Sequence, residues 1–241
     1  MADAKKKYPK FTSPRLAFKF PKLSEPDYGT KEYPKPDGEY STRGVARADD
    51  PIIQAFIAKL APMHAEAVAM AEQEFKAMKV EARKKLGAVK VNDLFTTLYD
   101  QETEEPTGEI EFKFAMKAGG IVKKGPKTGQ KWSRKPDIYD AKGQLLKKAP
   151  AIWGGTIGKV SFEASPYFIP GTGAAGLKLN LLGAQIIDLV SGGQRTAASH
   201  GFGEEDGYSH EGSFDDESGE DSQEDTGLPE QTGGDPGDAD F

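Results

Sequence analysis

The chain has 241 residues, of which 32 are Lys or Arg and 38 are Asp or Glu, and it contains no cysteine. The lack of cysteine excludes disulfides, thiolate metal sites and a cysteine nucleophile. The N-terminus (MADAKKKYPK) lacks the apolar core of a signal peptide, and no apolar stretch is long enough to cross a membrane, so we expect a cytoplasmic protein.

Charge is divided sharply along the chain. Up to Arg195 there are 32 basic residues against 23 acidic ones, a net charge of +9, whereas 201–241 holds 15 acidic residues and no Lys or Arg. A block of like charge with few apolar residues cannot bury enough surface to offset the entropy of ordering it. We therefore predict one folded domain over 1–195, with two smaller domains as the alternative, and a disordered acidic tail over 196–241.

The N-terminal half is expected to hold two strands and one long helix. Apolar alternation predicts a strand over 15–20, with Phe20 on its apolar face, and a second strand over 39–46, with a Pro- and Gly-rich loop between them. A helix is expected over about 50–86, where Asp49 or Asp50 caps its start. Pro62 is expected to kink or break this helix.

The second half is expected to be strands and loops. The clearest alternation is at 109–117, where Ile110, Phe112 and Phe114 point to one side and Lys113 to the other. Further strands are expected around 132–139, 159–167 and 177–190, the last broken near Gly183. Five or six strands and one inserted helix predict a mainly β protein built around a small barrel.

Motifs typical of catalysis or phosphate binding are weak. GTGAAG at 171–176 matches a dinucleotide-binding motif, but a strand follows it instead of a helix. GIVKKGPKT at 120–128 approaches a P-loop, but proline interrupts it, so we interpret both segments as loops. His64, His200 and His210 are far apart in the sequence, and we expect no metal site, no cofactor and no enzymatic activity.

Cations and aromatic residues are interleaved in the second half of the chain. From 109 to 195 there are 14 Lys or Arg against six acidic residues, with several aromatics beside them. Proteins that hold single nucleic-acid strands use cations for phosphates and aromatic rings for bases. This favours a single-strand binding protein. The alternative is an acidic-tailed chaperone or protein-interaction module with a basic body.

Short segments along most of the chain resemble the single-stranded DNA-binding proteins of T7-like bacteriophages. They are FTS at 11–13, PDYG at 26–29, FKF at 112–114, GG at 154–155, PY at 166–167 and the acidic tail ending in Asp-Phe. The resemblance implies a five-stranded OB-fold barrel with one long inserted helix and sequence-independent coating of single-stranded DNA in replication, recombination and repair. It also implies a tail that contacts the replicative DNA polymerase and primase-helicase, and a location in the host cell cytoplasm. A homodimer is compatible with the resemblance.

The resemblance also indicates site residues. It makes Lys113 the groove lysine and Tyr167 the stacking tyrosine after a proline. The sequence departs from the family pattern at three positions, where Asp37 stands for an arginine, Ala115 for a second lysine and Ile169 for a tryptophan. We therefore expect further DNA-binding residues among Lys35, Arg43, Lys117, Lys159, Lys178, Tyr28, Trp132 and Phe168. In the tail, the expected partner-binding residues are Phe241, Asp240 and Asp238.

Overall fold

The structure is a computed structural model that describes residues 8–123 and 125–191. The predicted acidic tail and its partner-binding residues Phe241, Asp240 and Asp238 lie outside this range. Within the described residues, no helix combines the length and the apolar character needed to cross a membrane.

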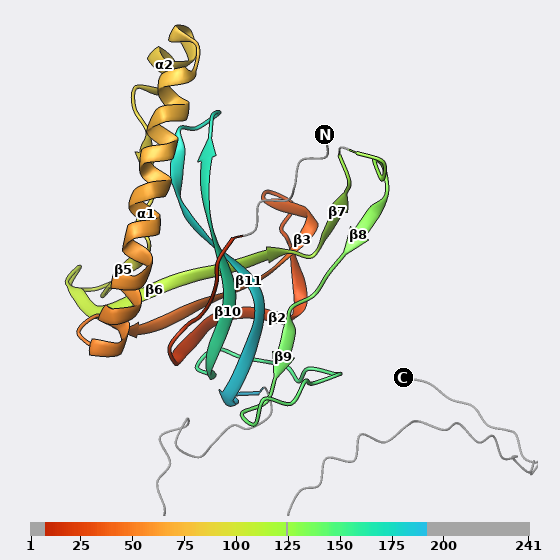
Figure 1. The fold of residues 1–241 in the computed structure, drawn as a ribbon. Helices are drawn as coiled ribbons and strands as arrows, with labels where there is room; N and C mark the ends of the chain where they lie inside the picture. Colours follow the sequence, from red (N-terminus) through yellow and green to blue (C-terminus); the bar gives the residue numbers. More distant parts are fainter. Residues whose placement is uncertain (1–7, 124, 192–241) are drawn as a thin grey trace, which may run out of the picture. The chain divides into compact units, whose positions relative to one another are not determined.

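Five long strands form a closed barrel (Figure 1). They are hydrogen-bonded in the ring order β2-β3-β6-β11-β10, and β10 pairs in turn with β2. Every pairing in the ring is antiparallel except that of β6 with β11, which is parallel. This is the Greek-key barrel of the OB-fold, so the predicted fold class is confirmed. The strands are β2 (Leu16–Gly29), β3 (Pro34–Arg47), β6 (Pro106–Lys117), β10 (Ile157–Ile169) and β11 (Ala174–Asp188).

Aromatic side chains fill the barrel. In β6, Phe112 and Phe114 are fully buried while Lys113 between them is exposed, as the alternation predicts. Phe162 of β10 lies 5.1 Å from Phe114 between ring centroids, and Phe56 reaches both Phe112 and Phe162, at 5.3 and 6.0 Å. These edge-to-face and tilted contacts connect segments that are distant in the sequence.

The helix α1 (Pro51–Ala77) packs its buried face on β10 and β11. Asp50 caps it by accepting a hydrogen bond from the backbone N–H of Ile52, and Pro51 occupies its first position. The expected break at Pro62 is wrong, because α1 continues through this residue and ends before Met78. Pro62 is exposed, so water can satisfy the carbonyl that loses its hydrogen bond. A short helix follows, α2 (Val80–Leu86).

The Pro- and Gly-rich segment predicted as an irregular loop is instead the long end of the β2–β3 hairpin. Pro26 lies in β2, and Pro34 and Pro36 lie in β3. The register of this hairpin shifts three times after Lys19, and these irregular positions accommodate residues that cannot donate a backbone hydrogen bond.

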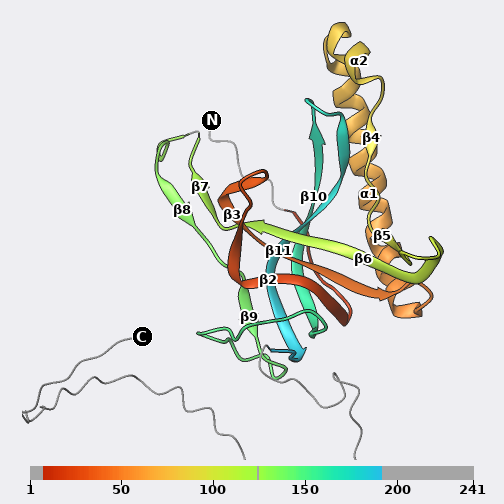
Figure 2. The same ribbon diagram turned by 180° about the vertical axis from the view of Figure 1, so that it is seen from behind.

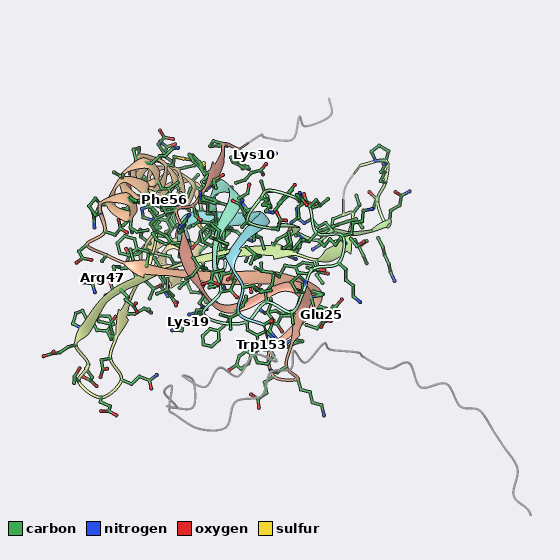
Figure 3. All side chains as sticks on the ribbon, turned by 90° about the horizontal axis from the view of Figure 1, so that it is seen from below. Lys10, Lys19, Glu25, Arg47, Phe56 and Trp153 are labelled. Atoms are coloured by element: carbon green, nitrogen blue, oxygen red, sulfur yellow. The ribbon has the colours of Figure 1, made fainter. Side chains whose placement is uncertain are left out.

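The same irregularity corrects the prediction for Phe20. Its side chain is 67% exposed instead of lying on the apolar face of the strand, because the register shift begins directly after Lys19. Figure 3 shows Lys19 and Phe56 on opposite sides of the layer formed by β2 and β3. β2 therefore presents an exposed aromatic ring at Phe20.

Short strands complete the sheet and a separate hairpin (Figure 2). β1 (Lys10–Thr12) pairs with β10, β5 (Thr96–Tyr99) pairs with β6, and both β4 (Lys90–Val91) and β9 (Asp137–Tyr139) pair in parallel with β11. β7 (Gly119–Ile121) and β8 (Lys131–Ser133) form the hairpin that holds the basic loop. The strand predicted over 132–139 is thus divided between two sheets.

Both glycine features of the last strand pair have a structural role. Residues 171–176 turn β10 into β11 and continue as strand, with Gly173 at φ +75°, so their interpretation as a β-loop is confirmed. The expected break near Gly183 is a β-bulge: Ser161 pairs with Gly183, and Phe162 with Leu181. The strand continues beyond this bulge.

Candidate nucleic-acid interface

Two adjoining hollows lie on the outside of the barrel. The larger, which we call the main groove, has a volume of about 610 Å³ and is lined by Lys113 of β6, Lys178 of β11 and Tyr167 of β10. The smaller, the β3 hollow, has a volume of about 200 Å³ and is lined by Phe20 and Arg43. Because Lys113 lines both, the two hollows adjoin at this residue.

Strand pairing brings the residues of the main groove together. The parallel pairing of β6 with β11 sets Phe114 beside Leu179, which places their neighbours Lys113 and Lys178 on adjacent strands. In β10, Tyr167 lies opposite Gly176 of β11. Residues separated by more than 50 positions in the sequence thus share one face.

Tyr167 is held in place by its hydroxyl group. The side-chain amide of Asn92 donates a hydrogen bond to this hydroxyl at 2.6 Å, and the carbonyl of Asn92 lies 2.8 Å from Nε2 of His64. A Cβ atom at Gly176 would lie 3.3 Å from the same hydroxyl, so glycine makes room for the tyrosine side chain. A ring already fixed in position loses little conformational entropy when a base stacks on it.

Cations crowd together beside Tyr167. Protein atoms around the Lys178 ammonium lower its pKa, and Lys117, Arg134 and Lys113 lower it further, while Glu39 opposes them. Neither Lys113 nor Lys178 has an ion-pair partner within 4 Å among the described residues. A polyanion placed here would relieve the mutual repulsion of these cations.

Other predicted cations are already paired with acids. Lys35 contacts Asp27 at 2.7 Å and Glu39 at 2.9 Å, so the pKa of Lys35 is raised and that of Asp27 is lowered. Lys117 contacts Asp37 at 2.7 Å. Asp37, which stands where the family pattern has arginine, therefore offsets a cation instead of supplying one.

Arg43 pairs with Glu111, whose side chain is only 7% exposed. This carboxylate also lies 3.9 Å from the Lys19 ammonium. Arg43 nevertheless lines the β3 hollow, so its guanidinium retains an exposed side next to the groove path.

Five predicted site residues line neither of these hollows, and one of them is Lys117, which is paired with Asp37. Lys159 lies in a separate hollow of about 270 Å³, and it is eight residues from Tyr167 along β10, roughly 26 Å. Trp132 lies in the β7–β8 hairpin with the Arg134 guanidinium 5.2 Å from its ring. Tyr28 packs beside Gly38 near the end of the β2–β3 hairpin. Phe168 follows Tyr167 in β10 and points to the other face.

Three residues of this surface were not predicted as site residues. Phe20 was expected in the core, and the register shift that turns it outward leaves no periodic signal. Asn92 lies in a segment after α2 that has no clear periodicity, yet it contacts Tyr167. Glu111 looks like an ordinary outward residue of β6, but it is buried by its neighbours. The described residues contain no group of three or more side chains able to hold a metal ion.

A groove that brings lysines and an aromatic side chain together across an OB barrel is typical of proteins that bind single nucleic-acid strands. The comparison with known families agrees with this class. The family model described as the single-stranded DNA-binding protein of bacteriophage T7 matches residues 16–189, well over half of the chain. The chain belongs to this family.

Individual relatives are similar over most of their length. The chain is 29% identical to the single-stranded DNA-binding protein of Enterobacteria phage T3 over 173 residues, which are 71% of this chain and 72% of that protein. It is 27% identical to the counterpart from Escherichia phage T7 over 195 residues, 79% of this chain and 80% of that one. The crystal structure of gp2.5, a single-stranded DNA-binding protein encoded by bacteriophage T7, superposes with a TM-score of 0.59 at 26% identity, covering 85% of this chain and all of that one.

Proposed function

We propose that this protein coats single-stranded DNA irrespective of its sequence. The observation that carries the proposal is the main groove, which Lys113, Lys178 and Tyr167 line together from three neighbouring strands. The two cations bind phosphates, and the tyrosine stacks on a base. Neither contact distinguishes one base from another, because every nucleotide has a phosphate and every base has an aromatic face.

Lys35 and Lys117 contribute less to phosphate binding, because each already forms an ion pair with a carboxylate. Binding a phosphate weakens or breaks these ion pairs, so each of the two lysines adds less affinity than an unpaired lysine. Arg43 stays oriented by Glu111 while its exposed side meets the strand. Lys113 and Lys178 therefore supply the larger part of the phosphate affinity.

Family membership and the acidic composition of the tail support a proposal for the cellular role. We propose that the protein protects single strands during phage DNA replication, recombination and repair in the host cell cytoplasm. Its acidic tail recruits the replicative DNA polymerase and primase-helicase, with Phe241, Asp240 and Asp238 as the contact residues. An aromatic ring beside carboxylates suits a basic partner pocket with an apolar floor.

Titration with oligo-dT at several salt concentrations tests the function. Binding should weaken as salt rises, with a log–log slope of about −0.7 for each phosphate contacted. A binding constant that does not change with salt, or no binding at all, would contradict the proposal. That result would favour the alternative, an acidic-tailed protein-interaction module or chaperone.

A further inference from the structure

Phe20 is held in a position that is unfavourable for an aromatic residue. Its φ is +51°, in the left-handed region that residues with a Cβ atom rarely occupy. Its side chain is also 67% exposed. Both the backbone strain and the exposed ring reduce the stability of the fold, so packing does not account for Phe20.

Two cations surround the ring of Phe20. The Lys19 ammonium lies 5.5 Å from the ring centroid and the Arg43 guanidinium lies 6.0 Å from it. Glu111 contacts both cations from beneath, with its side chain only 7% exposed. A buried carboxylate thus orients two cations around an exposed aromatic ring, which is the combination that a nucleotide requires: a surface for its base and charge for its phosphate.

The position of Phe20 connects it to the main groove. Phe20 and Arg43 line the β3 hollow, and Lys113 lines both this hollow and the main groove. Arg43 of β3 pairs directly with Lys113 of β6 in the sheet register. A single DNA strand whose base stacks on Tyr167 therefore passes Lys113 before it reaches Phe20.

We propose that Phe20, Lys19 and Arg43 form a second base-stacking subsite at the β2–β3 end of the groove. The exposed face of the Phe20 ring takes a base, and Lys19 and Arg43 bind the phosphate attached to the same nucleotide. The subsite rests on the proposed function, since it extends the path of the same single strand. It fixes the direction of that path across the outer faces of β10, β11, β6 and β3.

The test separates stacking from phosphate binding. Wild type, Phe20→Ala and Phe20→Trp are titrated with oligo-dT and with a chain of abasic deoxyribose phosphates of equal length. Phe20→Ala should weaken oligo-dT binding by about 5-fold to about 150-fold, the effect of losing one stacked base, and should leave binding of the abasic chain unchanged. Phe20→Trp should keep the wild-type affinity for both.

Tyr33→Ala is the matched control. Tyr33 is 78% exposed, more than Phe20, and it lines neither the main groove nor the β3 hollow. Its removal should leave both affinities unchanged. An equal loss in Phe20→Ala and Tyr33→Ala would overturn the subsite, because it would show a general effect of exposed aromatics.

Further outcomes are decisive in either direction. Unchanged oligo-dT binding by Phe20→Ala, or an equal loss on the abasic chain, overturns the subsite while leaving the proposed function intact. Failure of the wild type to bind oligo-dT overturns the proposed function itself. Ultraviolet crosslinking of wild type to oligo-dT, followed by peptide mapping, gives a measurement that needs no variant. Crosslinks at Phe20 support the subsite, and crosslinks at Tyr167 without any at Phe20 overturn it.

Discussion

Tyr167 and Lys113 lie in the same groove but should respond differently to substitution. Tyr167→Ala should weaken single-strand affinity by about 1–3 kcal/mol, with little change in the salt slope, because the ring contacts a base. Lys113→Ala should lower the affinity for all sequences and reduce the slope by about one contact. Salt-dependent titrations of both variants with oligo-dT measure the difference.

Tyr167→Phe serves as the control for this pair. It removes only the hydroxyl that accepts the hydrogen bond from Asn92, so the stacking surface is kept. If Tyr167→Ala unfolds the protein but leaves the affinity of each folded molecule unchanged, Tyr167 has a structural role and its assignment is wrong.

Lys178 should stabilise the DNA complex but destabilise the free protein. Its pKa is lowered from the ordinary 10.5 by desolvation and by neighbouring cations. The penalty for its charge is fully present below the lowered pKa, and it disappears as pH rises toward 10.5, because the unfolded chain then holds the proton more tightly than the folded one. Lys178→Gln should therefore melt at a higher temperature than wild type at pH 7, with a smaller difference near pH 10, and bind oligo-dT more weakly.

Lys113→Gln is the matched comparison for melting, since Lys113 occupies an exposed position in β6. A difference in melting temperature between Lys178→Gln and wild type that does not shrink toward pH 10 would contradict the charge explanation.

At the residue scale, the sequence correctly predicted the direction of a side chain where the strand that carries it is regular. Lys113 points outward because β6 pairs with β3 without a register shift from Glu109 to Lys117. Phe20 follows the same alternation in the sequence but points outward in the structure, because β2 changes register directly after Lys19. Periodicity carries no information about such a shift, so it could not have revealed the β3 hollow.

At the scale of elements, Pro62 is a residue of α1 that lowers the stability of the helix. Pro62 lies inside the helix, is exposed and leaves one backbone carbonyl without its helical partner. Pro62→Ala restores that hydrogen bond without disturbing the buried face, and should raise the free energy of unfolding by about 1–3 kcal/mol, a gain reduced by the greater freedom of the unfolded chain. Chemical denaturation of the variant measures this gain.

Single-strand affinity provides the control for Pro62→Ala. The helix packs on β10 and β11 from the side of its buried residues, and Pro62 lines neither hollow. Affinity for oligo-dT should therefore equal that of wild type. A loss of stability on substitution would mean that the proline ring itself makes a stabilising contact.

The sequence pattern correctly predicted the helix at α1, but the expected break at Pro62 was wrong. The spacing of Ile53, Phe56 and Leu60 produced a continuous buried face, and packing of this face on two strands outweighs the local effect of one proline. In the β2–β3 hairpin the same logic applies to strands. Several prolines suggested a loop, but the shifted register gave them positions where no ladder hydrogen bond is required.

At the scale of the whole molecule, the acidic tail should compete with DNA. A segment of charge −15 tethered to a body of charge +9 has a local concentration on the order of millimolar near the basic groove. Deletion of 201–241 should tighten oligo-dT binding, and most strongly at low salt, because ions screen the competing attraction. Equal affinities of the full-length and truncated proteins at low salt would exclude this competition.

Removal of Phe241 alone tests the proposed recruitment of partners by the tail. One residue carries little of the tail's charge, so DNA affinity should stay near that of wild type, whereas capture of the replicative polymerase or primase-helicase should be lost. Pull-down of these partners by the full-length and Phe241-deleted proteins measures the effect. Undiminished capture without Phe241 would contradict its assignment as the docking residue.

The barrel class was predictable from the sequence, but the arrangement of its surface was not. Alternation identified strands near each of the five barrel positions, and the family resemblance implied the OB-fold. Lys159 and Tyr167 were both predicted to bind DNA, and both lie in the same strand, but only Tyr167 lines the main groove. The loop that brings Asn92 to Tyr167 depends on contacts between distant parts of the chain.

The closure of the barrel has a consequence for synthesis on the ribosome. β2 meets β10 through only two residue pairs, Ala17 with Ile157 and Leu16 with Gly158. The ring therefore stays open until the chain has been translated past β10, and β11 must then pair with β6 to complete it. At about 5–20 residues per second, the nascent chain exposes the apolar faces of β2, β3 and β6 for several seconds before they can be enclosed.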